Sequence, residues 1–355
     1  MPCIHYGQIH TKFGVSIDKH LSEIPLELYN KSIIASHGDV VIAITSEDLE
    51  GSCKSTAWLG DYDVAVSSHA AVYKHSINPK FIAYYLRSKS FYYEKMKYAR
   101  GFKVMEIKPT DIEKIPIPVP PMAEQERIVE ELDLLQGIIE KKKEQLKAYD
   151  QLAQSIFYTM FGDVEEDTPV SHYISALRGG KSLAGEAECK NKVLKTGAVT
   201  YDYFKGDEVK NLPTDYTPIK EHILKDGDIL ISRMNTLEYV GACAYVWKAP
   251  SNTYLPDRLW KATLKDNINP IFLWFSLIQD KTKEQIRSLA SGTSGSMKNI
   301  SIPRFLTVKI KCIPLSLQEE FAEKVESIER QKALIRQSID EVQTMFDYTM
   351  DKYFG

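Results

Sequence analysis

The sequence predicts an α+β protein with two tandem mixed α/β domains, each followed by a long helix, and with the two helices packed as an antiparallel coiled coil. The main observation is a pattern that occurs twice, 193 residues apart. Each copy opens with a Pro-x-x-x-Gln element, at 121–125 and 314–318, and continues into a long charged amphipathic stretch. Both stretches end in Phe-Gly, at Gly162 and Gly355, so the spacing is the same at both ends of the pattern. A chain of 355 residues is long enough for two ordinary domains and these helices.

The composition is that of an ordinary globular protein, with 43% hydrophobic and 26% charged residues. No run of about 18 apolar residues occurs, and the N-terminus has no secretory signal, so we expect a cytoplasmic protein without a membrane partner. Because the net charge is −3, any DNA interface has to consist of local patches. The cysteines form neither a zinc pattern nor a disulfide pattern: they are Cys3, Cys53, Cys189, Cys243 and Cys312.

The domains contain matching short elements. A Gly-Asp turn leads into an apolar strand at 38–43 and again at 227–232. An Asn-Pro-x-Phe tetrapeptide follows in each copy, at 78–81 and 269–272. We interpret it as the start of a short helix, with Asn as the N-cap and Pro as the first residue. Its similarity to an adenine-methylase motif is treated as accidental, because the second proline of that motif is absent.

Long helices are expected over 121–162 and 314–355, after domains at 1–120 and 163–313. Apolar residues in both stretches step by 4 and 3 over about five heptads, with one lysine in each series; ordinary surface helices remain the alternative. Because the first helix leads into the second domain and the second helix leaves it, side-by-side packing makes them antiparallel. A helix of about 37 residues spans roughly 55 Å, which is on the order of 16 base pairs of B-DNA. The predicted seam residues are Ile128, Leu132, Leu135, Ile139, Leu146, Phe321, Val325, Ile328, Ile335, Ile339 and Val342.

Each domain also has a basic region, with a charge of +6 over 80–108 and +5 over 279–311. Each region contains a glycine loop, and glycines, hydroxyls and lysines on a loop suit contact with phosphates and base edges. A solvated loop on a lysine-rich surface remains the alternative. Arginine can bind guanine and asparagine can bind adenine in a bidentate way, although any one such residue could instead serve a structural ion pair. The DNA-binding candidates are Arg100, Lys103, Arg233, Asn235, Arg258, Lys261, Thr293, Ser294, Ser296 and Lys298.

Motifs of catalysis are absent from the sequence. It contains no G-x-x-x-x-G-K-[ST] loop, no G-x-G-x-x-G and no H-E-x-x-H, and its histidines have no metal-ligand spacing. The acidic residues at 109–114 lack the spacing of a nuclease site. We therefore predict no catalytic residue, no metal site and no cofactor of its own.

At this point the chain resembles the specificity subunit of a type I restriction–modification system. The resemblance is carried by Ile-Pro-Ile-Pro-Val-Pro-Pro-Met-Ala-Glu-Gln-Glu-Arg-Ile at 115–128 and by its weaker repeat at 310–321. The Ser-Gly-Thr-Ser-Gly-Ser-Met-Lys-Asn-Ile run at 291–300 and Phe-x-x-Met-Phe-Gly at 157–162 also fit. It covers the whole chain.

The resemblance implies that each domain is a target recognition domain that reads one half of a bipartite, gapped DNA sequence, and that the two helices set the gap. It implies a non-catalytic subunit that docks two adenine-methyltransferase subunits, which use S-adenosylmethionine, and restriction subunits, which cleave foreign DNA using ATP. The alternative function is a coiled-coil assembly scaffold that does not bind DNA. Steep salt dependence of binding would distinguish a DNA reader from such a scaffold.

The first domain departs from the repeat at its start. Gly7 aligns with Gly197, which leaves 163–190 of the second domain without a counterpart. We therefore expect the first target recognition domain to be N-terminally incomplete and the second to be the DNA reader. The target bases and the gap length are not predicted.

Overall fold

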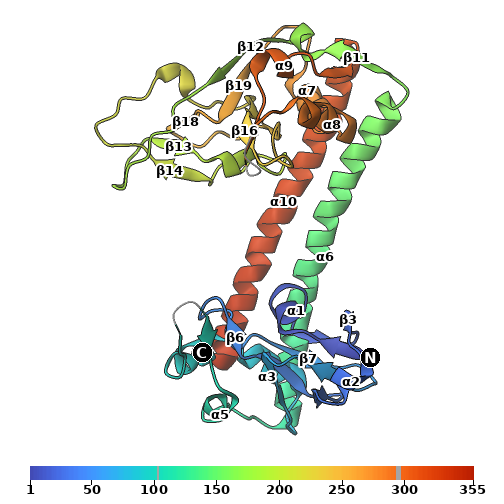
Figure 1. The fold of residues 1–355 in the computed structure, drawn as a ribbon, viewed down its shortest axis with the longest axis vertical. Helices are drawn as coiled ribbons and strands as arrows, with labels where there is room; N and C mark the ends of the chain where they lie inside the picture. The colour runs from blue at the N-terminus through green and yellow to red at the C-terminus, as the bar shows by residue number, and fades with distance from the viewer. Residues whose placement is uncertain (102–103, 293–296) are drawn as a thin grey trace. The chain divides into compact units, whose positions relative to one another are not determined.

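The computed structural model describes residues 1–101, 104–292 and 297–355 (Figure 1). The chain divides into two compact units. Unit 1 comprises Met1–Leu146 together with Leu334–Gly355, and unit 2 comprises Lys147–Ala333. The long helices α6 (Met122–Phe161) and α10 (Leu315–Phe354), of 40 residues each, therefore contribute one part to each unit. Within the described residues, no helix has both the length and the hydrophobicity that a membrane span requires.

Unit 1 is built around two four-stranded sheets, counted over its described residues. One sheet has the order β3-β1-β8-β4 and the other β2-β7-β5-β9, while β6 and β10 form a short ribbon. The strands are β1 (Pro2–Ile4), β2 (Ser16–Ile17), β3 (Ser22–Glu23), β4 (Ile33–Ala35), β5 (Val40–Ala43), β6 (Thr45–Ser46), β7 (Ser55–Trp58), β8 (Val64–Val66), β9 (Ala70–Tyr73) and β10 (Met105–Glu106). The helices besides α6 and α10 are α1 (Tyr6–Thr11), α2 (Leu26–Tyr29), α3 (Pro79–Tyr85), α4 (Lys89–Met96) and α5 (Pro109–Ile112).

Unit 2 contains, in its described residues, a four-stranded sheet of order β12-β19-β15-β17 and a three-stranded sheet of order β14-β13-β18. Two ribbons, β11-β21 and β16-β20, complete it. The strands are β11 (Glu166–Pro169), β12 (Ile174–Gly179), β13 (Lys192–Leu194), β14 (Val209–Asn211), β15 (Ile229–Ser232), β16 (Met234–Asn235), β17 (Cys243–Tyr245), β18 (Thr253–Tyr254), β19 (Leu259–Leu264), β20 (Lys298–Asn299) and β21 (Lys309–Lys311). The helices are α7 (Pro270–Leu277), α8 (Asp280–Leu289) and α9 (Ile302–Phe305), with 3-10 turns η1 (Val170–His172), η2 (Thr196–Val199) and η3 (Lys220–His222).

The two units repeat the same strand pairings, as the duplicated sequence predicts. β5 pairs antiparallel with β9 in unit 1, and β15 pairs in the same way with β19 in unit 2. β1 runs parallel to β8 as β13 does to β18, and the β6-β10 ribbon matches the β16-β20 ribbon. The Gly-Asp turns before β5 and β15 place Gly38 and Gly227 at φ +90° and +87°, where a side chain would be strained.

The Asn-Pro elements start helices, which confirms the capping interpretation. Asn78 accepts hydrogen bonds from two backbone N–H groups in the first turn of α3, at 3.0 and 3.2 Å. Asn269 accepts the same pair of bonds at the start of α7. In both helices the proline occupies the first turn, where its missing N–H has no cost.

The glutamine of the repeated Pro-x-x-x-Gln element links each short helix to a long one. Gln125 and Gln318 are 2% and 0% exposed. The Oε1 atoms of Gln125 and Gln318 accept hydrogen bonds from the backbone N–H groups of Asn78 and Asn269, both at 2.8 Å. Their Nε2 groups donate to a carbonyl oxygen at the entry of α6 and α10, at 2.8 and 2.7 Å. The repeated glutamine therefore fixes the start of α3 or α7 against a long helix.

Within each unit, the parts of α6 and α10 pack against one another. In unit 2, the ring of Phe161 lies 5.6 Å from that of Phe321, while Lys332, later in α10, donates at 2.6 Å to Asp150, earlier in α6. Residues later in α6 thus contact residues earlier in α10, so the two segments run antiparallel. In unit 1, the hydroxyl of Tyr353 donates to a Glu131 oxygen at 2.7 Å, which continues the same order. The predicted fold class, with its antiparallel helix pair, is confirmed.

The predicted seam residues are buried to different degrees. The fully buried ones are Ile128, Leu132, Leu135, Ile139, Phe321, Val325 and Ile328, and the partly buried ones are Leu146, Ile335, Ile339 and Val342. The seam lysine Lys332 is 4% exposed, and its ammonium group bonds to Asp150 and Glu329. A buried charge needs such partners, since an unpaired one would destabilise the unit.

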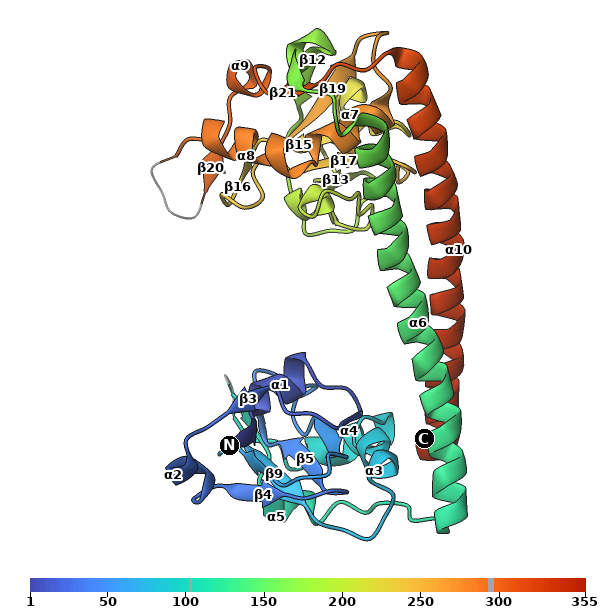
Figure 2. The same cartoon turned by 90° about the vertical axis from the view of Figure 1, so that its right-hand side faces the viewer.

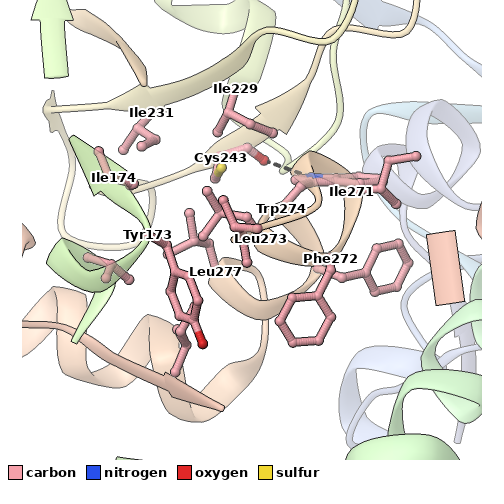
Figure 3. Packing of buried hydrophobic residues seen from close by; sticks show 14 of the residues in the cluster. Tyr173, Ile174, Ile229, Ile231, Cys243, Ile271, Phe272, Leu273, Trp274 and Leu277 are labelled. Carbon is pink, nitrogen blue, oxygen red and sulfur yellow. Dashed lines mark hydrogen bonds between the residues drawn. The ribbon is translucent and has the colours of Figure 1, made fainter. Parts of the chain in front are cut away.

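An apolar core joins the sheet and the helices of unit 2 (Figure 3). Tyr173 and Ile174 contribute to it from the start of β12, and Leu273 and Leu277 contribute from α7. Fully burying one such side chain stabilises the fold by about 1.5–3 kcal/mol. The segment that contains β11, η1 and β12 is therefore an integral layer of this core.

Candidate nucleic-acid interface

A two-stranded ribbon of unit 2 brings together three of the predicted contact residues. β16 and β20, labelled in Figure 2, pair antiparallel, and Asn235 lies opposite Lys298 in the register. Arg233 directly precedes β16, and its carbonyl oxygen accepts a hydrogen bond from the N–H of Ile300 at 3.0 Å. A guanidinium, a carboxamide and an ammonium group thus belong to one small element, where each can serve as a donor to phosphates or base edges.

Arg258 joins this element from the adjoining strand. The backbone N–H of Arg233 donates to the carbonyl oxygen of Arg258 at 3.0 Å, immediately before β19 begins. Arg258 is exposed, and neither arginine forms an ion pair with another described residue. Two guanidinium groups are therefore available for the fork-shaped contacts that bind guanine or phosphate.

The ammonium group of Lys261 is occupied within the unit. Its Nζ donates to the carbonyl oxygen of Ile223 at 2.9 Å and lies 3.4 Å from Asp228, and the side chain is 19% exposed. In unit 1, Lys74, directly after the equivalent strand β9, lies 2.7 Å from Asp39, the aspartate of the other Gly-Asp turn. The structural ion pair that the sequence left open fits Lys261 better than a base contact does.

The glycine loop of unit 2 is anchored at its base. Ser291 and Asn299 exchange two backbone hydrogen bonds of 2.8 Å, and the Lys298 ammonium group donates to the Gly292 carbonyl oxygen at 2.9 Å. The predicted contacts Thr293, Ser294 and Ser296 lie outside the described residues. The base of the loop, at Ser291 and Asn299, therefore lies at the β16-β20 ribbon.

Two basic residues that the sequence analysis did not single out lie beside β19 and the segment before it. Arg178 on β12 is the register partner of Lys261, and the N–H of Lys181 donates to the Leu255 carbonyl oxygen at 3.2 Å. Both are exposed. The only signal in the sequence is two basic residues around Gly179-Gly180, because it is the β12-β19 pairing that brings them to the site. We name the set of Arg178, Lys181, Arg233, Arg258 and Lys298 the basic strip.

Positive charge near the basic strip affects a neighbouring histidine. The pKa of His222 is lowered, mainly by burial and also by the ammonium groups of Lys261 and Lys181, while Glu221 opposes the shift. His222 lies at the end of η3, and its carbonyl oxygen accepts a hydrogen bond from the N–H of Leu255 at 2.8 Å. Burial is the largest cause of the shift, and the two lysines add to it.

The equivalent ribbon of unit 1 carries less charge. Thr45 and Ser46 of β6 pair with β10 where unit 2 has Met234 and Asn235. Arg100 is exposed, forms a backbone bridge to Glu106, and lies 3.6 Å from the buried carboxylate of Asp111. Lys103 lies outside the described residues.

A polar cleft of about 1040 Å³ lies beside the ribbon of unit 1. Glu47, Asp48 and Glu50 line it, so its wall is partly acidic. Its cations already have partners: the Lys54 ammonium group donates to a carbonyl oxygen at 2.8 Å, and Arg87 donates to two carbonyl oxygens at 2.7 and 2.8 Å. The charge of this cleft suits phosphate binding less well than the basic strip does.

Part of the charge in the predicted basic regions is structural. Lys95 and Lys283, at matching places in α4 and α8, are 3% and 5% exposed. Lys95 donates to the carbonyl oxygens of Glu50 and Ser52, at 3.0 and 2.5 Å, and Lys283 donates to Gly241 at 3.1 Å. Burial lowers the pKa of Lys95. These lysines hold loops in place and are not available to DNA.

The comparisons with known proteins agree with one another. The family model for the type I restriction modification DNA specificity domain matches residues 9–148 and 181–344. The specificity subunit of the EcoKI enzyme from Escherichia coli K12 is 24% identical over 328 residues, covering 86% of this chain and 70% of the relative. That of the MjaVIII enzyme from Methanocaldococcus jannaschii is 23% identical over 344 residues, covering 90% and 78%.

Two solved structures share the fold. The S subunit of a type I restriction–modification system from M. genitalium has a TM-score of 0.54 at 14% identity, with 90% of this chain and 83% of the other covered. A structure from a study of assembly and conformational transition of the type I system has a TM-score of 0.53 at 17% identity, with 90% and 82% covered. The family model covers well over half of the chain. The chain belongs to the type I restriction–modification DNA specificity family.

Family membership confirms the functional expectation for this specificity subunit. Specificity subunits recognise a DNA target sequence, take part in assembling the restriction–modification complex, and are not themselves catalysts. Among the residues that the structure describes, no group of three or more His, Cys, Asp or Glu side chains could hold a metal ion. The predicted contact residues stay predictions, because the family assignment does not test individual side chains.

Proposed function

We propose that this specificity subunit reads a bipartite, gapped DNA sequence, with one half-site for each of its target recognition domains. The observation that carries the proposal is the basic strip together with Asn235: Arg233 precedes the β16-β20 ribbon, Lys298 and Asn235 are partners on it, and the exposed Arg258 is joined to Arg233 by a backbone hydrogen bond. The domain division that goes with it is 1–120 and 163–313 for the recognition domains and 121–162 and 314–355 for the spacer helices. In this scheme unit 2 supplies most of the phosphate contacts.

The proposal assigns the chemistry to partner subunits. Two adenine-methyltransferase subunits would supply S-adenosylmethionine, and restriction subunits would supply ATP-dependent cleavage, in the cytoplasm where the DNA lies. This chain would hold those subunits on the target and contribute no cofactor. The buried Gln125 and Gln318 support this role, because they attach both recognition domains firmly to the long helices.

The long helices would set the length of the gap. Each has 40 residues, which corresponds to about 60 Å of helix at 1.5 Å per residue. A rigid helix pair of that kind can keep two DNA-reading surfaces at a fixed spacing.

The test is to map methylation with and without the side chains of Arg233 and Asn235. The chain is co-expressed with the methyltransferase subunit of its own system, and N6-methyladenine is located by single-molecule sequencing. We expect a bipartite motif with one fixed gap. The double variant Arg233→Ala, Asn235→Ala should relax the sequence requirement in one half-site. The control is Lys248→Ala: Lys248 is exposed and follows the C-terminal end of β17, so its loss should leave the motif unchanged.

A second measurement separates DNA reading from a scaffold role. DNA affinity of the purified complex should fall steeply as the salt concentration rises, because phosphate contacts release counterions. Assembly of the complex without any methylated motif, together with salt-independent DNA affinity, would contradict the proposal and favour a scaffold.

A further inference from the structure

The outer edge of β9 in unit 1 has no strand partner among the described residues. β9 is the last strand of its sheet and pairs only with β5. In unit 2 the equivalent strand β19 is paired on both sides, with β15 and with β12. The N–H of Ile44 donates to the carbonyl oxygen of His69 at 3.0 Å, and antiparallel bonding alternates along a strand, so the N–H of Val72 points away from β5. Such an edge is a template for another strand.

An apolar cavity of about 90 Å³ lies beside this edge. Ala71 and Tyr73 of β9, Ile82 of α3, and Ile115 and Ile117 after α5 contribute to its lining. The residues at 116–118 match β21 of unit 2 in the repeat, yet they belong to no strand. The free edge of β9 and the segment 116–118 therefore lie beside one apolar cavity.

Unit 2 shows what covers the same place in the duplicated fold. There, β11 pairs with β21 and β12 pairs with β19, so the segment 166–179 lies along both equivalent edges. Its residues Val170, Tyr173, Ile174 and Leu177 belong to the core, and Tyr173 and Ile174 are labelled in Figure 3. Ile310 is 1% exposed beneath this segment, whereas its counterpart Ile117 is only partly buried.

The side chains of unit 1 also leave more room. The strand registers match Ala71 with Trp260, and Trp260 packs edge-on against Phe305 at 5.9 Å between ring centroids. The repeat matches Phe305 with the smaller Ile112. An incoming segment could therefore place a large apolar side chain where unit 2 has its own tryptophan.

We propose that unit 1 binds an extended segment of another polypeptide chain, which adds to β9 as a strand and inserts an apolar side chain into the cavity. The partner segment has apolar residues spaced like 170, 173, 174 and 177 of this chain. Strand addition supplies main-chain hydrogen bonds for affinity and a pocket for specificity. A second copy of this chain is not the occupant chosen, because its segment 166–179 is already paired within its own unit 2. The proposal does not depend on DNA recognition.

The test uses the full-length protein and a synthetic, fluorescently labelled peptide with the sequence of residues 164–180. Fluorescence anisotropy should show saturable binding with one peptide per chain. A peptide carrying Tyr173→Asp and Ile174→Asp should bind at least ten-fold more weakly, because charged side chains cannot enter the apolar cavity.

Two variants of the protein locate the binding site. Val72→Pro removes the outward N–H while leaving the bonds to β5 intact, and should weaken binding at least ten-fold. Val72→Ile is the matched control, because it keeps the outward N–H and an apolar side chain at the cavity; it should bind the peptide normally. Circular dichroism melting checks that both variants remain folded.

Hydrogen–deuterium exchange separates the remaining outcomes. Protection of residues 70–75 by the peptide supports the proposal. Undiminished binding to the Val72→Pro variant, with loss of protection at β12, would mean that the peptide exchanges into unit 2, and would overturn it. The absence of binding would overturn it as well. If the protein forms a dimer and Val72→Pro dissociates it, the occupant is a second copy of this chain. That outcome would also contradict the proposal.

Discussion

His75 lies just beyond β9 and links the stability of unit 1 to pH. Its Nδ1 accepts a hydrogen bond from the N–H of Ile77 at 3.2 Å, while its buried Nε2 has no partner among the described residues. Burial lowers the pKa of His75, and the hydrogen bond and Asp39 oppose the shift only in part. An unfolded histidine takes up a proton near pH 6.5. Below that pH the unfolded state therefore binds more protons, so this contribution to stability is complete above about pH 6.5 and is lost as the pH falls through the lowered pKa.

We expect His75→Leu to reduce the loss of stability at acid pH. The substitution is conservative, because the repeat places Leu264 at the same position in unit 2. Urea unfolding at about pH 5 and about pH 8 measures the difference in free energy of unfolding between the two conditions. His37→Leu, at an exposed position, is the control for loss of a histidine. An unchanged difference in the His75→Leu variant would contradict the assignment.

Arg233 is the residue for which we predict the largest single effect on DNA recognition. It stands where β15, Arg258 and the β16-β20 ribbon meet. A bidentate contact to a base contributes about 1–3 kcal/mol of discrimination, so Arg233→Ala should lower specificity about ten- to hundred-fold at one position of a half-site. Lys261→Ala is the informative comparison: if Lys261 serves the ion pair with Asp228, this change should lower stability and leave specificity intact. Competition binding with single-base variants of the target measures both.

At the element scale, the buried glutamines Gln125 and Gln318 connect the short helices α3 and α7 to the long helices, and we expect their loss to destabilise the fold. Gln318→Ala leaves the N–H of Asn269 and a carbonyl oxygen at the entry of α10 without their side-chain partner. A buried polar group left unpaired costs about 1–3 kcal/mol, so we expect a loss of at least that size in the free energy of unfolding. Gln125→Ala should have the same effect in unit 1. Gln337→Ala, at an exposed position of α10, is the control and should change stability little.

The elements that the sequence predicted well are those with local signals. Asn269-Pro270 caps a helix, Gly227 starts a strand, and the 4-3 stepping of apolar residues marks α6 and α10. The pairing of β12 with β19 joins residues far apart in the chain, and no local pattern encodes it. For the same reason the sequence does not single out Arg178, and the charge of +5 over 279–311 includes Lys283, which is buried.

At the scale of the whole molecule, the proposed function treats the long helices as a spacer, and their length can be changed without touching either recognition domain. One heptad inserted at matched heights in α6 and α10 preserves the seam, because seven residues turn an α-helix almost two full turns. It adds about 10 Å of helix, which equals about three base pairs by rise. The same three base pairs rotate the far half-site by roughly 100° about the DNA axis, at about 10.5 base pairs per turn.

We therefore expect the methylated motif of this variant to keep both half-sites, to gain a gap about three base pairs longer, and to be methylated less completely. Single-molecule sequencing of the co-expressed system reads the gap directly. A heptad inserted in α6 alone shifts Asp150 or Glu131 relative to its partner in α10. Because the antiparallel seam then loses its register, methylation should be lost and not moved to a new gap. A variant with both insertions that methylates the original motif at its original gap would show that the helices do not determine the spacing.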